Sequence, residues 1–565
     1  MNKKILLLVS LFLASTFAFS GGLVTNTNQS TAWTRMLVRD ASTGIDAVFY
    51  NPAGLSKLSD GFHFSISNQS LFQTQDINST FPYLNGNDYV GTVKAPIFPS
   101  VYGVFKKGKM AVSFGFNPVG GGGGATFDNG LPSMEIPFAG LVPRLSTSLA
   151  PLGGSVSAYS MNMFFEGTSV YFGLQAGVTY EVNDWLSLYL GGRYIMAKNT
   201  YNGYIQDVKI TTPSGVMAPG TYVNGVAGQA AAGATAAAGA VTSIQPLIDA
   251  NAGAYTFDQL YGAGYITAAQ RDQLKGGLLA LGVPSATVDA MSALVAQGTY
   301  STFATQLAAA ATQLYGTAIY LNGVTADQEA DVVQKGNGFT PIIGANISLM
   351  NEKLNIGIKY EFLTKMDLVD EVNDLNGVEL GFVDGGSVSS TGVFTPTYMF
   401  NDGEITNADI PAFLSIGAAY KATDKLNVSV GVHTYFDQAA GWATNEDGNA
   451  TVDGNFLEYG LGLEYALTDN FLLSVGYLGT QTSATEFYND DLSYSLNTNT
   501  LGGGGAFKLN DRYTVQFGGF YTMYQDATFD KLDAATGIAY TETYAKNTWA
   551  VSLGLDISLG KKKTE

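Results

Sequence analysis

The side chains that most often do chemistry are scarce in this chain of 565 residues. It has no Cys and two His, so thiolate chemistry is excluded and little is left to ligate zinc. One of the two, His433, could serve as the base of a serine esterase. Such an enzyme also needs a nucleophile within hydrogen-bond reach, and the chain contains no Gly-x-Ser-x-Gly segment. The sequence therefore predicts a protein that is not an enzyme and carries no cofactor or metal.

Two cationic side chains stand out because they lie in stretches where apolar residues alternate with small or polar ones. Lys359 is flanked by Ile358 and Tyr360, and Arg193 has a similar setting. Neighbouring side chains of a strand point to opposite faces. If the apolar face of these strands lies against a membrane, a cation on that face costs ~2–4 kcal/mol at the middle of the bilayer. Both cations are therefore expected to point inward, where they are candidate partners for the carboxylate of a solute. The alternative is an internal salt bridge with one of three acidic residues: Glu361, Glu458 or Glu464.

The composition indicates that much of the surface faces something other than water. Only 13% of the residues are charged while 46% are hydrophobic, and a soluble protein usually carries nearly twice that share of charge. The formal net charge of −19 argues against nucleic acid as a partner, because binding to phosphates needs a basic surface.

The first twenty residues are typical of a signal peptide. Asn2-Lys3-Lys4 is a basic start, residues 5–19 are apolar, and Ala18-Phe19-Ser20 fits a cleavage site. We expect residues 1–20 to be removed, so that the mature chain begins at Gly21. No later apolar run reaches the ~18 to 20 residues that a membrane helix needs. The exported protein is therefore either soluble or a β-barrel.

The apolar residues recur with a period of two along several stretches, which is typical of β-strands with two unlike faces. Near the C-terminus, Trp549, Val551 and Leu553 alternate with Ala550 and Ser552. The same alternation runs through three other segments: residues 354–362, 428–432 and 457–467. Soluble β-sandwiches can show this pattern too, so the lengths of the strands and loops must distinguish a sandwich from a barrel.

Short polar turns separate six pairs of long alternating segments and predict six hairpins. These turns are Lys106-Lys107-Gly108-Lys109, Asn183-Asp184, Asn351-Glu352, Thr423-Asp424, Thr468-Asp469 and Asn510-Asp511. With a first strand near residues 61–72 and a last strand at 547–560, the count is fourteen. We predict an all-β protein, with residues 61–565 forming a fourteen-stranded antiparallel transmembrane barrel in the lipid of a Gram-negative outer membrane. Its short turns face the periplasm and its long loops face outward, and we expect a monomer.

One long segment, residues 203–337, is Ala-rich and breaks the alternation. Thr267 to Gln270 and Thr325 to Gln328 have the pattern of capping boxes, and Gly298 and Gly316 lie where helices would end. We predict a helical insertion in the third external loop. A linker is the alternative, although structureless loops of this length are uncommon.

Residues 21–60 precede the first strand and do not have a strand pattern. They include Ala47-Val48-Phe49-Tyr50-Asn51-Pro52-Ala53-Gly54-Leu55. This stretch resembles the N-terminal hatch of the FadL family of outer-membrane long-chain fatty acid transporters, in which an Asn-Pro-Ala segment lies in a plug inside a fourteen-stranded barrel. The resemblance implies that Asn51, Pro52 and Ala53 form a hatch element that contacts the barrel wall near the exit. The alternative is an ordinary Asn-Pro turn.

The resemblance also implies a function and a route. Members of that family admit long-chain fatty acids or, in some branches, aromatic hydrocarbons, which diffuse through the plugged barrel and leave by a gap in its wall. In that family the gap arises from a kink in the third strand. Here that strand is expected to run from Met110 to about Asn117, and Pro118, Gly120 and Gly121 are candidates for the kink, since proline and glycine both weaken a strand. Alternatively, these residues begin a flexible external loop.

Two other functions compete with passive uptake of hydrophobic molecules. A general diffusion porin would have an open lumen lined by many charges of both signs. A surface adhesin would use the Ala-rich insertion to bind its target. Deletion of residues 215–330 separates the adhesin from the transporter, because an adhesin would lose its activity and a transporter would keep part of its uptake.

Overall fold

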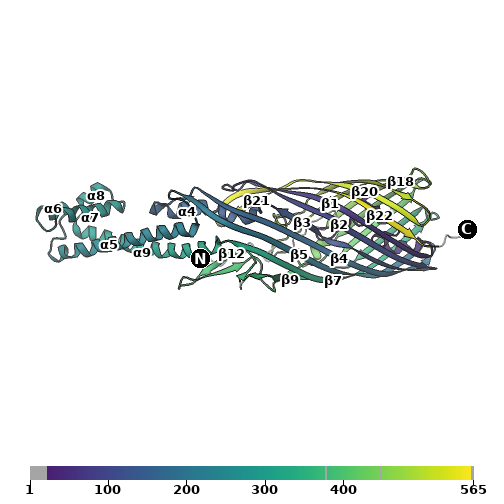
Figure 1. The fold of residues 1–565 in the computed structure, drawn as a ribbon, viewed down its shortest axis with the longest axis horizontal. Helices are drawn as coiled ribbons and strands as arrows, with labels where there is room; N and C mark the ends of the chain where they lie inside the picture. Colours follow the sequence, from purple (N-terminus) through teal and green to yellow (C-terminus); the bar gives the residue numbers. More distant parts are fainter. Residues whose placement is uncertain (1–21, 376–377, 446, 561–565) are drawn as a thin grey trace.

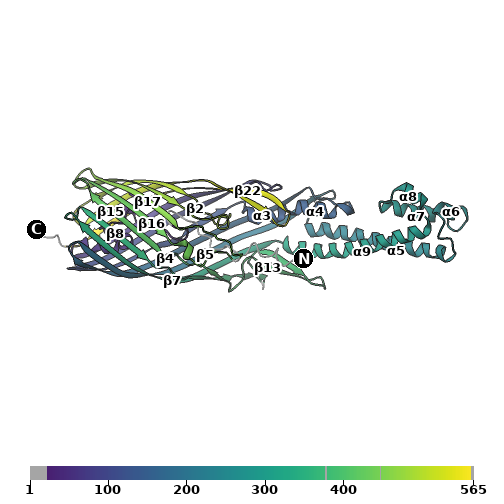
Figure 2. The same cartoon turned by 180° about the vertical axis from the view of Figure 1, so that it is seen from behind.

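The computed structural model describes residues 22–375, 378–445 and 447–560, which form a long closed β-sheet with helices beyond one end (Figures 1 and 2). The predicted signal peptide lies outside the described residues. The first half of the sheet consists of β1 (Gly61–Ser79), β2 (Asp88–Lys107), β3 (Met110–Phe127), β4 (Ala158–Asn183), β5 (Leu186–Thr212), β6 (Gly215–Met217), β7 (Gln328–Leu349), β8 (Leu354–Glu361) and β9 (Asp367–Val372). The second half consists of β14 (Ile405–Asn407), β15 (Phe413–Lys421), β16 (Leu426–Tyr435), β17 (Phe456–Ala466), β18 (Phe471–Gln481), β19 (Thr498–Lys508), β20 (Tyr513–Tyr524), β21 (Ala527–Asp533) and β22 (Ile538–Ser558).

These eighteen segments make a ring of fourteen antiparallel strands. Three of the fourteen strands are interrupted, so that each consists of two segments. β8 and β9 form one, since both pair with β7, and β15 and β14 form the next, since they pair with β8 and β9. β20 and β21 form the third, since both pair with β22. β6 is a short addition beside the end of β5. β22 pairs with β1 from His63↔Ser558 to Ser79↔Glu542 and closes the ring. The predicted fourteen-stranded barrel is confirmed, and each of the six predicted turns joins two neighbouring strands.

The outer face of the ring is apolar, and the alternation in the sequence explains why. On β22, Val551 and Leu553 are 52% and 67% exposed, whereas Ala550 and Ser552, which alternate with them, are buried. Leaving rows of large apolar side chains in water would cost about 25 cal/mol per Å². The wall therefore fits contact with lipid, with small and polar residues turned inward.

The hatch, residues 22–60, fills the inside of the ring. Its helices are α1 (Thr31–Thr34), α2 (Ala47–Tyr50) and the 3-10 helix η1 (Pro52–Lys57). Inward-facing glycines let its backbone lie directly against the wall. A Cβ at Gly476 would overlap the carbonyl oxygen of Met36, and one at Gly431 would overlap the carboxylate of Asp40. Part of the high glycine content therefore makes room for the hatch.

The Ala-rich insertion is helical and projects away from the barrel (Figure 1). It comprises α5 (Pro219–Asp249), α6 (Phe257–Gly262), α7 (Ala268–Ala280), α8 (Ser285–Ala290) and α9 (Ala293–Val324). α5 and α9 pack side by side as a stalk, and buried residues from all five helices form a hydrophobic cluster of their own towards the tip. Strand structure reaches into both ends of the predicted 203–337 segment, since β5 ends at Thr212 and β7 begins at Gln328. No helix in the described ranges is both long and apolar enough to cross a membrane.

Two details of the predicted insertion are wrong. Gly298 and Gly316 lie inside α9 rather than at helix ends, because a glycine costs a helix only about 1 kcal/mol and pairing with α5 favours continuation. The capping box at Thr267 is present, but Thr325 is the C-cap of α9 and Gln328 begins β7.

Shorter elements lie above the barrel rim. The connection between β3 and β4 contains α3 (Pro132–Ala139), α4 (Leu141–Leu149) and the 3-10 helix η2 (Ala150–Leu152). The connection between β9 and β14 contains two small hairpins, β10 (Asp374–Leu375) with β11 (Val378–Glu379), and β12 (Val383–Val388) with β13 (Phe394–Tyr398). A further 3-10 helix, η3 (Asp437–Ala439), follows β16.

Replacing Gly476 with Leu should displace the hatch while leaving the ring closed, because the new side chain must occupy the place of the Met36 carbonyl. We expect Gly476→Leu to raise the ion conductance of the protein in planar bilayers several-fold. Gly503→Leu is the matched control, since Gly503 lies on the outer face and a Cβ there approaches nothing closer than 3.6 Å. Unchanged conductance in a correctly folded Gly476→Leu protein would show that the hatch does not depend on this contact.

Candidate functional site

The wall of the barrel contains a break between β2 and β3. The two strands pair at Gly91–Val93 with Phe127–Ala125, and again at Val101–Lys107 with Phe116–Met110. Between these ladders, residues 94–100 of β2 and residues 117–124 of β3 do not pair with each other. Backbone groups left without ladder partners at membrane depth are costly unless the protein satisfies them in another way. Other parts of the protein must therefore provide hydrogen-bond partners for the backbone groups at the break.

The sequence of β3 produces this break. The strand does not end near Asn117 as expected but continues to Phe127, because β4 holds its other edge. Pro118 pairs with Phe172 of β4, and the register then slips before Gly120 and again before Gly123, so β3 carries two extra residues. Such bulges bend a strand and interrupt its ladder. The unpaired segment of β2 contains two prolines, which have no amide N–H to donate: Pro96 and Pro99.

The hatch covers the break from inside and donates hydrogen bonds to backbone carbonyls of β3 there. The backbone N–H of Asn26 donates to the carbonyl of Val119 over 2.8 Å, and its side-chain amide donates to Gly121 over 2.6 Å. The Gln29 side chain donates to the carbonyl of Pro118 over 2.5 Å. The structure thus places the candidate kink residues Pro118, Gly120 and Gly121 at the break and in contact with the hatch.

The segment Asn51-Pro52-Ala53 fixes the hatch to a different part of the wall. Asn51 donates to Asn346 on β7 over 2.8 Å, and the carbonyl of Pro52 accepts a hydrogen bond from Thr179 on β4 over 2.6 Å. Ala53 packs against Tyr189 and Ile342. Thr179 is six residues further along β4 than Gly173, which pairs with Asn117, so the contact lies about 20 Å along the strand from the break.

The two lumenal cations predicted from strand parity bind the protein itself. The guanidinium of Arg193 forms two hydrogen bonds with Glu361, at 2.5 and 3.0 Å, and a third with Gln175 at 2.7 Å. Lys359 donates to Glu361 and to the carbonyl of Phe49, both over 2.8 Å, and both cations lie against the Phe49 ring. A void of about 20 Å³ beside them is too small for a solute. They could meet a solute carboxylate only after the hatch had moved.

Buried ion pairs between hatch and wall escaped the sequence analysis. His433 bridges Asp40 of the hatch, at 2.5 Å, and Glu458 of β17, at 2.8 Å. Arg35 of the hatch contacts Glu464 at 2.5 Å. The nearby Ser415 hydroxyl donates to Asp40 rather than facing the imidazole, so the arrangement is an ionic latch and lacks the nucleophile–base geometry of an esterase. Alternation places His433 and the two glutamates inside the barrel, but their hatch partners cannot be deduced from it.

An apolar groove of about 450 Å³ lies outside the barrel rim. Residues of α3, α4 and α9 form most of it, together with the end of β5 and the β12–β13 hairpin. Its apolar lining includes Met134, Phe138, Leu141, Leu145, Ile205, Leu314, Tyr320, Leu321, Phe382 and Met399. Two charged residues line it, Arg144 and Asp384, and Arg144 is exposed. The short helices α3 and α4 left no clear signal in the sequence, so the groove could not be predicted.

The connection between β18 and β19, residues 482–497, folds into the outer mouth of the barrel. The Tyr494 hydroxyl donates to the carbonyl of Ala545, and Asp491 accepts a 2.6 Å hydrogen bond from the backbone of Ser133 at the start of α3. Burial and the neighbouring Asp491 carboxylate raise the pKa of Asp490 to about 8. Lys531 lies close by and donates to the carbonyl of Asn489 over 3.0 Å.

This raised pKa predicts that the loop is held more tightly in acid. A carboxylate with a folded pKa near 8, against 3.8 ordinarily, holds a proton that it would release if the loop opened. Opening therefore becomes easier as the pH rises from about 4 to about 8. Hydrogen exchange should show less protection of residues 488–496 at pH 9 than at pH 6, after correction for intrinsic exchange rates. Asp490→Asn should reduce this difference, and an equal pH dependence in that variant would refute the assignment.

Comparison with solved structures supports the barrel fold described above. No protein-family model and no curated protein matches the chain. Among solved structures it is similar to a FadL homologue from Pseudomonas aeruginosa, with 13% identity over 95% of this chain and 99% of that chain and a TM-score of 0.52. It is also matched to the toluene transporters TodX from P. putida (11% identity, 93% and 98% of the chains, TM-score 0.47) and TbuX from Ralstonia pickettii (14%, 91% and 94%, 0.41). Those two scores are too low to add to the comparison. The chain therefore shares the fold of the Pseudomonas aeruginosa FadL homologue.

Proposed function

We propose that this protein is an outer-membrane channel through which hydrophobic molecules, long-chain fatty acids above all, enter by passive diffusion. The observation that carries the proposal is the break between β2 and β3 in a wall whose outer face is apolar. A solute that reaches the lumen at this level can pass sideways into the bilayer. An apolar solute gains about 25 cal/mol per Å² on leaving water, so no energy source is needed.

The filled lumen disfavours a general diffusion porin. Hydrophilic solutes need a water-filled path from one mouth to the other. The hatch occupies that path and is held by ion pairs through Arg35 and Asp40. Small displacements of the hatch at the break could open a sideways exit without opening an aqueous pore.

The groove outside the rim supports capture of a fatty acid. Its apolar lining suits an alkyl chain, and Arg144 is a cation suited to a carboxylate. The same fold that positions the groove brings it next to the mouth of the barrel, because α3 and α4 belong to the connection between β3 and β4. Arg193 and Lys359 are proposed as carboxylate partners deeper in the lumen, once the hatch has moved away from them.

Aromatic hydrocarbons are the second candidate solutes. Glu361 already pairs with both Arg193 and Lys359 in the lumen, and a neutral solute needs no free cation there. The two candidates differ in charge, so the role of Arg144 distinguishes them.

Uptake of labelled oleate and labelled toluene should be measured in cells that lack their own channels for these compounds. We expect the protein to restore uptake of oleate, and Arg144→Gln to reduce it about two- to fivefold at limiting concentration, as fits an exposed charge contact. Toluene uptake should be insensitive to that change. Arg271→Gln, at the far tip of the insertion, is the matched control. Restored uptake of toluene alone would favour the second candidate, and restored uptake of neither by correctly inserted protein would refute the proposal.

Closing the break should abolish sideways exit. Removing Ile97 from β2 and Val119 and Gly122 from β3 leaves six residues on each side and restores a continuous register with β1 and β4. We expect this deletion variant to fold as a barrel and to lose at least nine-tenths of its hydrophobic uptake. The control carries alanine at the same three positions and keeps the break. Full uptake by the deletion variant would rule out exit between β2 and β3.

A further inference from the structure

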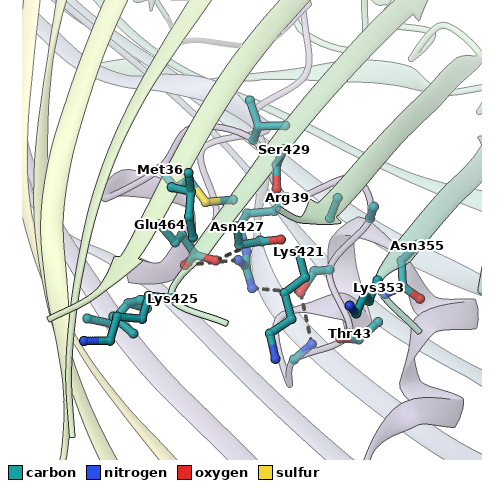
Figure 3. Close-up of a pocket in the computed structure, with 18 of the residues that line it drawn as sticks. Met36, Arg39, Thr43, Lys353, Asn355, Lys421, Lys425, Asn427, Ser429 and Glu464 are labelled. Atoms are coloured by element: carbon teal, nitrogen blue, oxygen red, sulfur yellow. Dashed lines mark hydrogen bonds and ion pairs between the residues drawn. The ribbon is translucent and has the colours of Figure 1, made fainter. Parts of the chain in front are cut away.

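A polar pocket of about 380 Å³ lies at the short-turn end of the barrel, opposite the helices. Figure 3 shows the side chains that line it. The hatch between Met36 and Gly44 forms one side of it. The ends of β8, β15, β16 and β17 and the turns between them form the other. It belongs to neither the break in the wall nor the external groove.

Three exposed lysines at inward strand positions line this pocket, and Figure 3 shows Lys425 extending away from the other two. Lys353 continues the inward series of β8, Lys421 ends that of β15, and Lys425 precedes that of β16. These three strands are neighbours in the ring. The backbone N–H of Lys421 donates to the carbonyl of Lys353 over 2.8 Å, so two like charges face each other across the strands. Such a pair is unfavourable unless an anion lies between or beside the two groups.

The carboxylates around the pocket do little to offset these charges. Glu352 is paired with Lys57 at 3.0 Å, and Glu464 is paired with Arg35 at 2.5 Å. Asp424 reaches Lys421 only at 3.7 Å and is 98% exposed. Lys353 and Lys425 form no ion pair with any residue in the described ranges. The lining of the pocket thus carries four cations and three carboxylates, in a chain with a net charge of −19.

We propose that Lys353, Lys421 and Lys425 form an oxyanion site that binds a carboxylate or phosphate group against the hatch. The pocket also contains Arg39 and Thr43 of the hatch, and Figure 3 shows both beside the lysines. A bound anion would therefore touch the segment that carries Asp40 and its latch to His433. The site does not depend on which solute crosses the barrel. Its anion is either a free small molecule or the phosphate of a lipid headgroup at the membrane surface.

Calorimetric titration of the full chain with inorganic phosphate, in uncharged maltoside micelles at constant ionic strength, tests the site. We expect saturable binding by the wild type and at least tenfold weaker binding by the triple variant Lys353→Gln, Lys421→Gln, Lys425→Gln. The matched control, Lys209→Gln, Lys275→Gln, Lys335→Gln, removes three ion-paired charges away from the short-turn end and should bind as the wild type does. No saturable binding by the wild type, or undiminished binding by the triple variant, would overturn the proposal.

The same titration in vesicles of phosphatidylethanolamine and phosphatidylglycerol separates the two sources of the anion. If phosphate still binds to the reconstituted protein, the site takes a free oxyanion. If phosphate binds in micelles but is excluded in vesicles, lipid headgroups occupy the site. The vesicle experiment distinguishes the source of the anion only after lysine-dependent binding has been measured in micelles.

Discussion

Backbone polar groups at membrane depth must find partners inside the protein, and the rest of this structure depends on that constraint. The ring meets it by pairing β22 with β1, so that no sheet edge faces lipid. The break between β2 and β3 is the place where ladder pairing alone does not suffice. There, Asn26 and Gln29 of the hatch satisfy carbonyls of β3. The hatch is therefore both the plug of the lumen and a structural partner of the weakest part of the wall.

The hatch is held unequally along its length. Residues 22–34 carry no charge, and near the break they are held by neutral hydrogen bonds, each worth about 1 kcal/mol. Further along, Arg35 and Asp40 form buried ion pairs with the wall, and breaking such a pair costs about 3–5 kcal/mol when its partner stays buried. The part of the hatch that covers the break is thus held to the wall without ion pairs. This gradient suits a sideways exit with a lumen that stays closed to water.

Local sequence patterns predicted the barrel well, because turn residues and the alternation of apolar and polar residues are both set within a single hairpin. Turn residues such as Asn183-Asp184 and alternation such as that around Val551 each lie within one hairpin, and parity placed Arg193 and Lys359 inside. What the sequence could not show are contacts made at long range. The latch joins Asp40 to His433 across 393 residues of sequence, and β3 continues past Pro118 because β4 pairs with it. In isolation, five consecutive glycines after Pro118 indicate a loop more strongly than a strand.

The most direct test of sideways exit is to find where a solute in transit contacts the wall. A fatty acid with a diazirine on its alkyl chain can be photoactivated during uptake, and the labelled residues can be identified by mass spectrometry. Exit through the break predicts labels on residues 94–100 of β2 and 117–124 of β3, facing the hatch segment around Asn26. Labels gathered instead at the short-turn mouth, on residues such as Lys353 and Lys421, would mean that the solute leaves past the hatch and would contradict the account.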